Sequence, residues 1–216
     1  MENDDITVVI CAAGMGTRLG VGTTKALVDI CGKPLIVRQL ELLDNYDDVR
    51  IVLGYQAEQV IKVVNMYRKD IMFAFNYDYP NTGAAASLSK ALPCSRKYVV
   101  SIDGDLLINR DDFNTFMAYK GESIAVSTCN SDEPLKTKVV DGKVIKFGGI
   151  SSYEWPGLVK VKASNLRPYK GYIYELLQNI LPMQAIIVDA CDIDTQKDYK
   201  RAVLWFKKNS LMKRGD

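Results

Sequence analysis

A loop rich in small residues, from Ala12 to Gly20, is the first segment whose residues could do chemistry. Its glycines at positions 14 and 16 let the backbone approach a ligand closely and adopt positive φ. Successive backbone N–H groups in such a turn form a concave site for an anion. Arg18 adds a planar set of donors suited to phosphate oxygens, and Lys25 adds a second positive charge. These residues favour a phosphate group as the ligand.

The loop departs from both common phosphate-binding patterns. No Gly-Lys-Ser/Thr follows the glycines, so it is not a P-loop, and Leu19 stands where the dinucleotide fingerprint has its third glycine. A pair of glycines is a weak signal, and an ordinary turn with a solvated arginine explains it equally well. Arg18 and Lys25, placed near the carboxyl end of a predicted strand, favour the phosphate site.

Three aspartates form the second group of candidates: Asp103, Asp105 and, near the end of the sequence, Asp194. Asp103 and Asp105 end a predicted strand, and alternate residues of a strand share a face. Carboxylates that converge on phosphates hold Mg²⁺, which prefers hard oxygen ligands. Taken singly, Asp105 and Asp194 are also suited to capping the helices that follow them, and this explanation stays open.

The composition excludes several kinds of chemistry and of partner. The 216 residues contain no histidine, which excludes Ser-His-Asp and Cys-His nucleophiles and histidine-ligated metals. The net charge of +2 is too small to indicate nucleic acid as the partner. The five cysteines have no Cys-x-x-Cys spacing, and the first residues lack the apolar segment of a signal peptide. No apolar run approaches the roughly 18 residues of a membrane helix. We therefore expect a cytoplasmic protein without stable membrane association.

These candidate residues need strands and helices that bring them together, and the hydrophobic pattern predicts an alternation of the two. Residues 6–11 form a near-continuous apolar run, typical of a strand buried on both faces in a parallel sheet. Further strands are predicted at 49–53, 71–75 and 98–102, and helices at 34–43, 57–67, 82–92 and 109–119. This order predicts a Rossmann-like, doubly wound α/β fold, with ligands at the carboxyl ends of its strands.

The middle of the sequence has a different pattern. Short alternating strands are predicted at 123–129, 137–140, 143–147 and 158–161, with a hairpin turn at Asp141-Gly142. A helix at 169–180, a strand at 185–190 and a helix at 195–209 follow. We expect one domain over residues 1–216, with a mostly parallel mixed sheet and a small β-rich acceptor lobe at about 122–165.

Several segments together resemble the sugar-phosphate nucleotidyltransferase superfamily. They are Ala12–Leu19 (AAGMGTRL), Lys25–Leu27 (KAL), Gly32–Ile36 (GKPLI), Val52–Tyr55 (VLGY), Gly104-Asp105 after a strand, and Asp192–Thr195 (DIDT) before the last helix. Their order and spacing resemble the short, phosphocholine cytidylyltransferase-like branch. The resemblance covers nearly the whole chain and is most specific in the first 36 residues.

The resemblance implies a role for each matching residue. Arg18, Lys25 and Asp105 are the implied catalytic residues, the first two through contacts with the triphosphate. The residues expected to hold the nucleotide are Ala12, Ala13, Gly14, Met15, Gly16, Thr17 and Gly83. The expected ligands of Mg²⁺ are Asp105 and Asp194, with Asp103 as a helper. The residues expected to contact the acceptor are Asn81, Ser87 and Glu154. The Gly-Thr-Ala-like motif of the sugar enzymes is only approximated by Thr82–Ala85, which leaves the base open.

The implied reaction is a Mg²⁺-dependent transfer of a nucleotidyl group from a nucleoside triphosphate, with CTP favoured, to a phosphorylated small molecule. The acceptor is phosphocholine-like or a sugar phosphate, pyrophosphate is released, and a homodimer is compatible with this function. One alternative is a nucleotide-binding regulatory module without turnover. Another is a nucleotide-sugar glycosyltransferase, whose Asp-x-Asp metal site resembles Asp103–Asp105. The Gly14–Arg18 loop with Lys25 favours a triphosphate donor over the glycosyltransferase.

Five further residues have weaker signals. Tyr77, Tyr79, Tyr153 and Trp155 lie near predicted loops, where they would either line an acceptor pocket for a quaternary ammonium group or form partly buried structure. Lys160, on a predicted strand, is a candidate for the phosphate of the acceptor or part of a solvated strand face.

Overall fold

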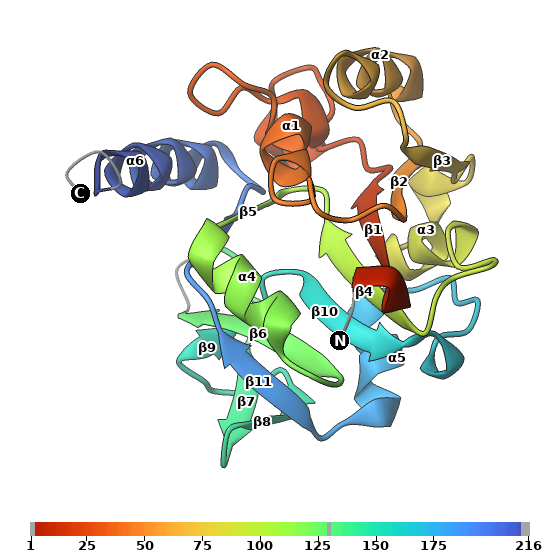
Figure 1. Cartoon of the computed structure of the whole chain (residues 1–216). Coiled ribbons are helices and arrows are strands. Elements are labelled where there is room, and N and C mark those ends of the chain that lie inside the picture. Colours follow the sequence, from red (N-terminus) through yellow and green to blue (C-terminus); the bar gives the residue numbers. More distant parts are fainter. Residues whose placement is uncertain (1–2, 129–130, 213–216) are drawn as a thin grey trace.

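The strands of the predicted alternation join into one mixed sheet at the centre of the molecule (Figure 1). The computed structural model describes residues 3–128 and 131–212. Within these residues ten strands form the sheet, in the order β3-β2-β1-β4-β10-β6-β11-β8-β7, with β9 paired to β6. Their bounds are β1 Ile6–Ala12, β2 Val49–Leu53, β3 Met72–Phe75, β4 Tyr98–Asp103, β6 Ser123–Thr128, β7 Thr137–Val140, β8 Lys143–Phe147, β9 Tyr153–Glu154, β10 Leu158–Lys162 and β11 Met183–Ile187.

Strand β1 lies in the parallel half of the sheet, between β2 and β4. Val8 pairs with Val49 of β2 and with Val100 of β4, and β3 continues the parallel order beyond β2. Every residue of β2 is buried, as expected for a strand that is covered on both faces. The predicted doubly wound α/β fold is confirmed.

Helices cover both faces of this parallel half, and the alternation of side chains along β1 divides the core between them. Val8 and Ile10 pack with α1, α2 and α4 on one face, whereas Val9 packs with α3 and α5 on the other. The bounds of these helices are α1 Leu35–Leu40, α2 Ala57–Tyr67, α3 Ala84–Lys90, α4 Arg110–Ala118 and α5 Ile173–Leu177. The carboxyl end of β1 therefore opens between two helical layers.

Helix α6, Gln196–Met212, lies outside these layers and extends away from the body of the molecule (Figure 1). It packs through Ala202 in a small cluster that includes Leu19 and Ile193. This cluster fixes the start of the helix beside the loop that follows β1. No helix among the described residues is long and apolar enough to cross a membrane.

The strands of residues 122–165 are antiparallel in part, as predicted. β7 and β8 form a hairpin whose turn residues, Asp141 and Gly142, both have positive φ, at 49° and 71°. β10 is antiparallel to both β4 and β6, so these strands extend the central sheet and form no separate sheet. Residue 129, the last of the strand predicted at 123–129, lies outside the described residues.

A second, two-stranded sheet is the main feature that the sequence did not predict. β5, Leu106–Ile108, pairs antiparallel with β12, Ala190–Asp192. The strand expected at 185–190 begins and ends earlier, at Met183–Ile187, which leaves residues 190–192 free to form β12. The helix expected at 169–180 is shorter, because α5 ends at Leu177 and a 3₁₀ turn follows.

Candidate active site

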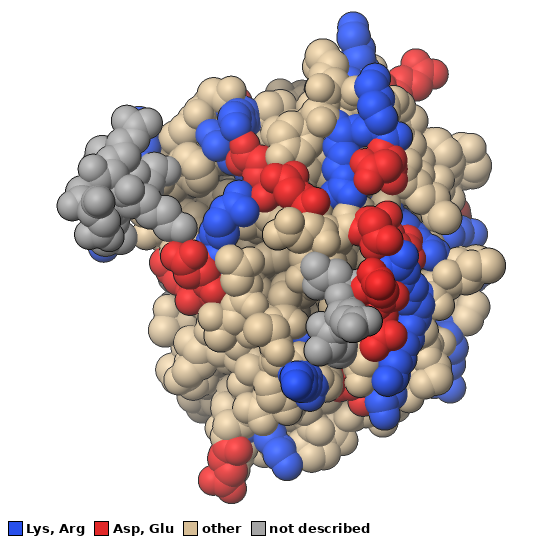
Figure 2. Space-filling view, in the orientation of Figure 1, with Lys and Arg blue, Asp and Glu red and all other residues tan. Residues whose placement is uncertain are grey.

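A cleft of about 570 Å³ opens at the carboxyl ends of β1 and β4. The loop after β1 lines one side, and the turn after β4 lines the floor together with residues 192 and 194. This is the position at which open α/β sheets bind their ligands. On the face of the molecule seen in Figure 2, basic and acidic side chains lie beside one another. Residues of both charges line the cleft, among them Lys25 and Asp105.

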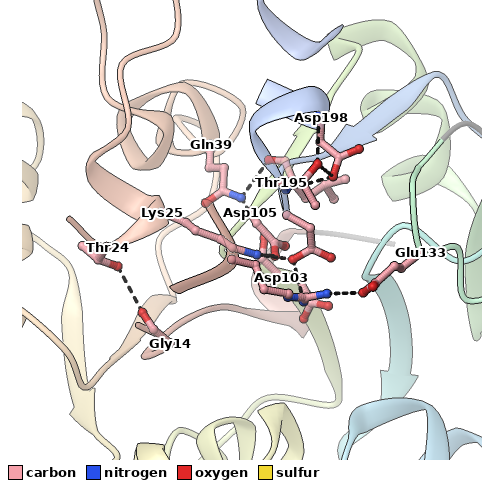
Figure 3. Close-up of polar contacts among 12 residues, drawn as sticks. Gly14, Thr24, Lys25, Gln39, Asp103, Asp105, Glu133, Thr195 and Asp198 are labelled. Atoms are coloured by element: carbon pink, nitrogen blue, oxygen red, sulfur yellow. Dashed lines mark hydrogen bonds and ion pairs between the residues drawn. The ribbon is translucent and has the colours of Figure 1, made fainter. Parts of the chain in front are cut away.

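Two cations and three carboxylates form a network inside the cleft (Figure 3). The Lys25 ammonium donates to Asp105 at 2.8 Å and also donates to Asp194. The Arg18 guanidinium donates to Asp194 at 2.8 Å and to Glu133 at 2.6 Å. Asp194 therefore joins both cations, and residues from the start, the middle and the end of the chain meet at one point.

The small second sheet is what brings Asp105 and Asp194 together. Leu106 of β5 is paired with Asp192 of β12, and the Ile193 amide donates to the Asp105 carbonyl at 3.1 Å. Asp105 and Asp194 flank this pairing, so their side chains reach the same end of the cleft. Convergence of the two carboxylates follows from a short β-ladder and not from the central sheet.

The capping explanation for these aspartates does not hold in the structure. Helix α4 is capped by Asn109, whose side chain accepts from the amide of Asp111 at 2.9 Å and from that of Asp112. At the start of α6, Thr195 and Asp198 exchange side-chain and backbone hydrogen bonds in the manner of a capping box. Neither Asp105 nor Asp194 is needed to cap a helix.

Burial raises the pKa values of two carboxyl groups in the cleft. Burial, followed by the charge of Asp105, raises the pKa of Asp103 well above its usual range. The same two causes raise the pKa of Asp192 to about 7. For Lys25 burial opposes the charge, but the carboxylates of Asp105 and Asp194 outweigh it, and the pKa is raised. The floor of the cleft therefore carries less negative charge than its carboxyl groups suggest.

The donor set suits a hard cation. The Oδ1 atom of Asp103 is buried and has no hydrogen-bond partner among the described residues, so it is free to accept from a ligand or to be protonated. Asp105 and Asp194 supply further carboxylate oxygens, the kind of ligand that Mg²⁺ prefers. The described residues contain no group of three or more such side chains arranged for a metal, and the Lys25 ammonium lies between two of them.

Glycines allow the loop after β1, Ala12–Gly20, to lie close to the turn after β4, Asp103–Leu106, which we call the acidic turn. Gly16 has φ 62°, and a Cβ there would lie 2.8 Å from the Lys25 side chain. A Cβ on Gly104 would lie 2.6 Å from the Cys11 carbonyl oxygen, to which the Gly104 amide donates at 3.0 Å. Gly14 has open space within 4 Å. Gly104 thus packs the turn on β1, whereas Gly14 leaves room in the cleft.

Most of the residues singled out in the sequence line this one cleft. They are Ala12, Ala13, Gly14, Met15, Gly16, Thr17, Arg18, Lys25, Gly83, Ser87, Asp103, Asp105 and Asp194. Asn81 does not line it, because its side chain is exposed in a turn and donates to Asp78 at 2.8 Å. Glu154 does not line it either, because it is buried on β9 and accepts from the Ser131 hydroxyl. The lining of this cleft therefore gives no support to the expected acceptor contacts of Asn81 and Glu154.

Several lining residues were missed or left open. Glu133 and Asp192 also line the cleft. Asp192 was part of the DIDT segment but was given no role, and no motif included Glu133. Of the aromatic candidates, Tyr79 and Trp155 line the cleft, while Tyr77 is 83% exposed elsewhere. Two tyrosines not considered, Tyr172 and Tyr174, also line it, with their rings stacked at 5.8 Å.

Lys160 contacts neither solvent nor the cleft. It is fully buried on β10, and its ammonium donates to three backbone carbonyls at the end of α4: Phe116, Met117 and Tyr119. Both suggested locations for Lys160, at an acceptor phosphate and on a solvated strand face, are wrong.

The fold is that of known nucleotidyltransferases. Residues 8–149 match the MobA-like NTP transferase domain, and the chain belongs to this family. It is a nucleotidyltransferase of the sugar-phosphate and NTP transferase type.

Individual relatives show how far the similarity extends. The bifunctional protein GlmU of Sulfurimonas denitrificans is 29% identical over 140 residues, which are 62% of this chain and 31% of that protein. The chain thus spans about a third of the length of this relative. The inositol-1-phosphate CTP transferase from T. maritima has a TM-score of 0.76 at 17% identity, covering 91% of this chain and 94% of that one. The CTP:phosphocholine cytidylyltransferase LicC from Streptococcus pneumoniae has a TM-score of 0.71 at 20% identity, covering 93% and 99%.

Proposed function

We propose that this enzyme transfers a nucleotidyl group, with CTP as the favoured donor, to the phosphate of a small molecule, and that it requires Mg²⁺. The observation that carries the proposal is the network in which Lys25 contacts both Asp105 and Asp194 beneath the glycine loop. Such a network places cationic groups and metal-binding carboxylates within reach of one triphosphate.

The proposed reaction needs no general base. A phosphate monoester has a second pKa of about 6, so the acceptor is largely a dianion at neutral pH. One of its oxygens attacks the α-phosphorus of the triphosphate, a new P–O bond forms, and the bond to pyrophosphate breaks. The absence of histidine is therefore no obstacle. The enzyme instead has to bring two anions together and stabilise the departing pyrophosphate.

The chain supplies charge and shape for this task. Backbone amides of the Ala12–Thr17 loop, which lines the cleft, would bind the nucleotide and its phosphates. Arg18 and Lys25 would neutralise the triphosphate and the leaving pyrophosphate. Asp194 and Glu133 hold Arg18, and Asp105 and Asp194 hold Lys25.

Asp105 and Asp194 are the residues that would hold Mg²⁺, with Asp103 as a further oxygen donor. The metal would neutralise phosphate charge and help to orient the triphosphate. The free Oδ1 atom of Asp103 and the all-oxygen donor set support this assignment. It predicts that Mg²⁺ strengthens nucleotide binding as well as turnover.

The aromatic wall of the cleft favours an acceptor with a positively charged group. Trp155, Tyr172 and Tyr174 line the cleft on the side of residues 155–174, and Glu133 adds a carboxylate. Aromatic faces attract quaternary ammonium groups, so a phosphocholine-like acceptor fits this wall better than a sugar phosphate, whose sugar carries no positive charge. Arg18 and Lys25 are the cationic residues among those that line the cleft, and the triphosphate would engage both.

A two-dimensional substrate screen tests the proposal. CTP, UTP, GTP and ATP are each combined with phosphocholine and with sugar 1-phosphates, and Mg²⁺-dependent release of pyrophosphate is measured. A thermal-shift series with Mg²⁺ runs in parallel, in which the cognate nucleotide stabilises by about 2.7 kcal/mol at a hundredfold excess over Kd. We expect CTP with phosphocholine to be the most active pair. If UTP and a sugar phosphate are turned over instead, the proposed donor and acceptor are both wrong. If no pair releases pyrophosphate, the whole proposal is refuted.

A further inference from the structure

Gln39 is a polar residue in the middle of an otherwise apolar helix face. It lies on α1, where it is 2% exposed, and its buried neighbours on the helix are Leu35, Ile36, Val37 and Leu40. A side-chain amide in such a position costs free energy unless it is hydrogen-bonded. Its contacts therefore indicate what the helix gains from it.

The two protons of the Gln39 amide hold both ends of the acidic turn (Figure 3). The Nε2 atom donates to the Asp103 carbonyl at 2.8 Å and to the Leu106 carbonyl at 2.9 Å. Asp105 lies between these two carbonyls. One rigid amide thus fixes the span of backbone that presents the Asp105 carboxylate to Lys25.

The remaining hydrogen bonds of the turn come from backbone groups. The Asp103 amide donates to Gly157, the Gly104 amide donates to Cys11, and the Asp105 carbonyl accepts from Ile193. Among the described residues, Gln39 provides the side-chain hydrogen bonds to this backbone. The turn is therefore held from α1, from β1 and from the second sheet, and the contact from α1 depends on a single side chain.

Residue 39 carries a side-chain amide although one of the two polar atoms of that amide has no hydrogen-bond partner. The Oε1 atom of Gln39 is buried and has no hydrogen-bond partner among the described residues. An unpaired buried acceptor is unfavourable, and an apolar side chain of the same size would remove it. The two donated hydrogen bonds are what an apolar side chain cannot provide. This contrast points to a role in placing the turn beyond filling the core.

We propose that Gln39 is a positioning residue, which fixes the Asp103–Leu106 turn and so holds Asp105 where the metal and triphosphate require it. The role rests on the proposed function of Asp105. Loss of the Nε2 donors frees the turn to move, and a displacement of about 1 Å at a reacting group costs as much as 10²-fold in rate. The nucleotide contacts proposed for the Ala12–Thr17 loop do not pass through Gln39, whereas those made through Asp105 and the metal do.

The test compares two variants at the position with a matched core control. Gln39→Met keeps the volume and removes the donors, and Gln39→Glu keeps the shape but gains a donor only when protonated. Leu40→Val removes one methylene from a buried neighbour on the same helix and leaves both Gln39 hydrogen bonds in place. For each protein, hydrogen exchange of the amides at 103–106 is measured without ligand, and kcat and the nucleotide KM are measured with Mg²⁺.

We expect Gln39→Met to raise exchange at 103–106 at least about 10-fold and to lower kcat about 10- to 100-fold. The nucleotide KM should rise as well, because Asp105 contributes to nucleotide binding through Mg²⁺. The kcat of Gln39→Glu relative to the parent should rise as the pH falls from 8 to 6, because protonation restores one donor. Leu40→Val should change neither the exchange at 103–106 nor kcat.

Two results would overturn the role of Gln39. One is exchange at 103–106 in Gln39→Met that equals the parent, and the other is a loss of kcat that Leu40→Val reproduces. If Gln39→Met fails to fold, an unchanged relative kcat of Gln39→Glu between pH 8 and 6 is the overturning result. If the parent enzyme turns over no substrate pair, the proposed function fails, while the exchange comparison still decides whether Gln39 fixes the turn.

Discussion

Lys25 and Asp105, which stand 80 residues apart in the sequence, form an ion pair of 2.8 Å in the candidate active site. Both side chains are largely buried, at 16% and 24% exposed. The same ammonium contacts Asp194, so two carboxylates share one positive charge. Lys25 thus lies between the two proposed metal ligands.

Replacement of Lys25 should therefore affect stability as well as activity. In Lys25→Met the carboxylates of Asp105 and Asp194 lose their shared counter-charge, and we expect a loss of about 1–3 kcal/mol in the free energy of unfolding without metal. Added Mg²⁺ should recover much of this loss, because a cation replaces the missing charge. The rate of pyrophosphate release should fall roughly 10²–10³-fold. Urea unfolding with and without Mg²⁺, together with the pyrophosphate assay, measures all three effects.

Lys197 provides the control for this variant. It pairs with Asp132 on the surface and is 75% exposed. Lys197→Met should leave stability within about 0.5 kcal/mol of the parent and should not respond to Mg²⁺. If the two variants lose the same free energy of unfolding and respond equally to Mg²⁺, the charge of Lys25 has no particular effect in the cleft.

Replacement by alanine should have different effects at two glycines of the site. Gly104→Ala places a Cβ 2.6 Å from the Cys11 carbonyl oxygen, so the turn must shift, and we expect reduced thermal stability together with reduced kcat. Gly14→Ala meets no atom within 4 Å, so the fold should keep its stability within about 0.5 kcal/mol while the nucleotide KM rises. Thermal unfolding and steady-state kinetics of both variants separate a packing role from a ligand-facing role. Equal melting temperatures for the two would contradict the assignment of Gly104 to packing.

The parallel half of the fold is readable in the sequence because its strands are buried apolar runs. The helix predicted at 57–67 and the strand predicted at 49–53 have the observed bounds, Ala57–Tyr67 and Val49–Leu53. A strand covered on both faces needs apolar side chains at every position, and this pattern is visible without tertiary information. The glycine loop was placed correctly for the same reason, since it directly follows such a run.

The second sheet was not readable, because its two strands have three residues each and no measurable periodicity. Their pairing, Leu106 with Asp192, depends on how distant segments meet. The same reason explains why Glu133 and Asp192 were missed. Gln39 was overlooked because a glutamine in a helical pattern is ordinarily exposed, and only its contacts with the acidic turn reveal its burial.

Removal of the Glu133 carboxylate should favour nucleotide binding. Glu133 competes with the triphosphate for Arg18, and both side chains are more than half exposed, at 68% and 54%. Glu133→Gln should leave stability nearly unchanged, because exposed ion pairs contribute about 0–1 kcal/mol. The nucleotide Kd should fall by a few-fold, and the difference from the parent should shrink as salt is raised. Titration calorimetry at 50 and 300 mM NaCl measures this effect, and an unchanged or weaker affinity at low salt would contradict it.

The buried lysine of β10 predicts a pH dependence of stability. Burial lowers the pKa of Lys160 to about 8, whereas an unfolded lysine titrates near 10.4. Between these values the unfolded chain binds the extra proton, so the contribution of Lys160 to stability rises with pH, by up to about 1.4 kcal/mol per pH unit. Lys160→Met lacks this contribution, and the parent should gain stability relative to the variant from pH 8 to pH 10. Urea unfolding of both proteins at intervals across this range measures the difference, in which groups common to the two cancel. A constant difference would mean that the carbonyls of Phe116, Met117 and Tyr119 keep the ammonium charged in spite of its burial.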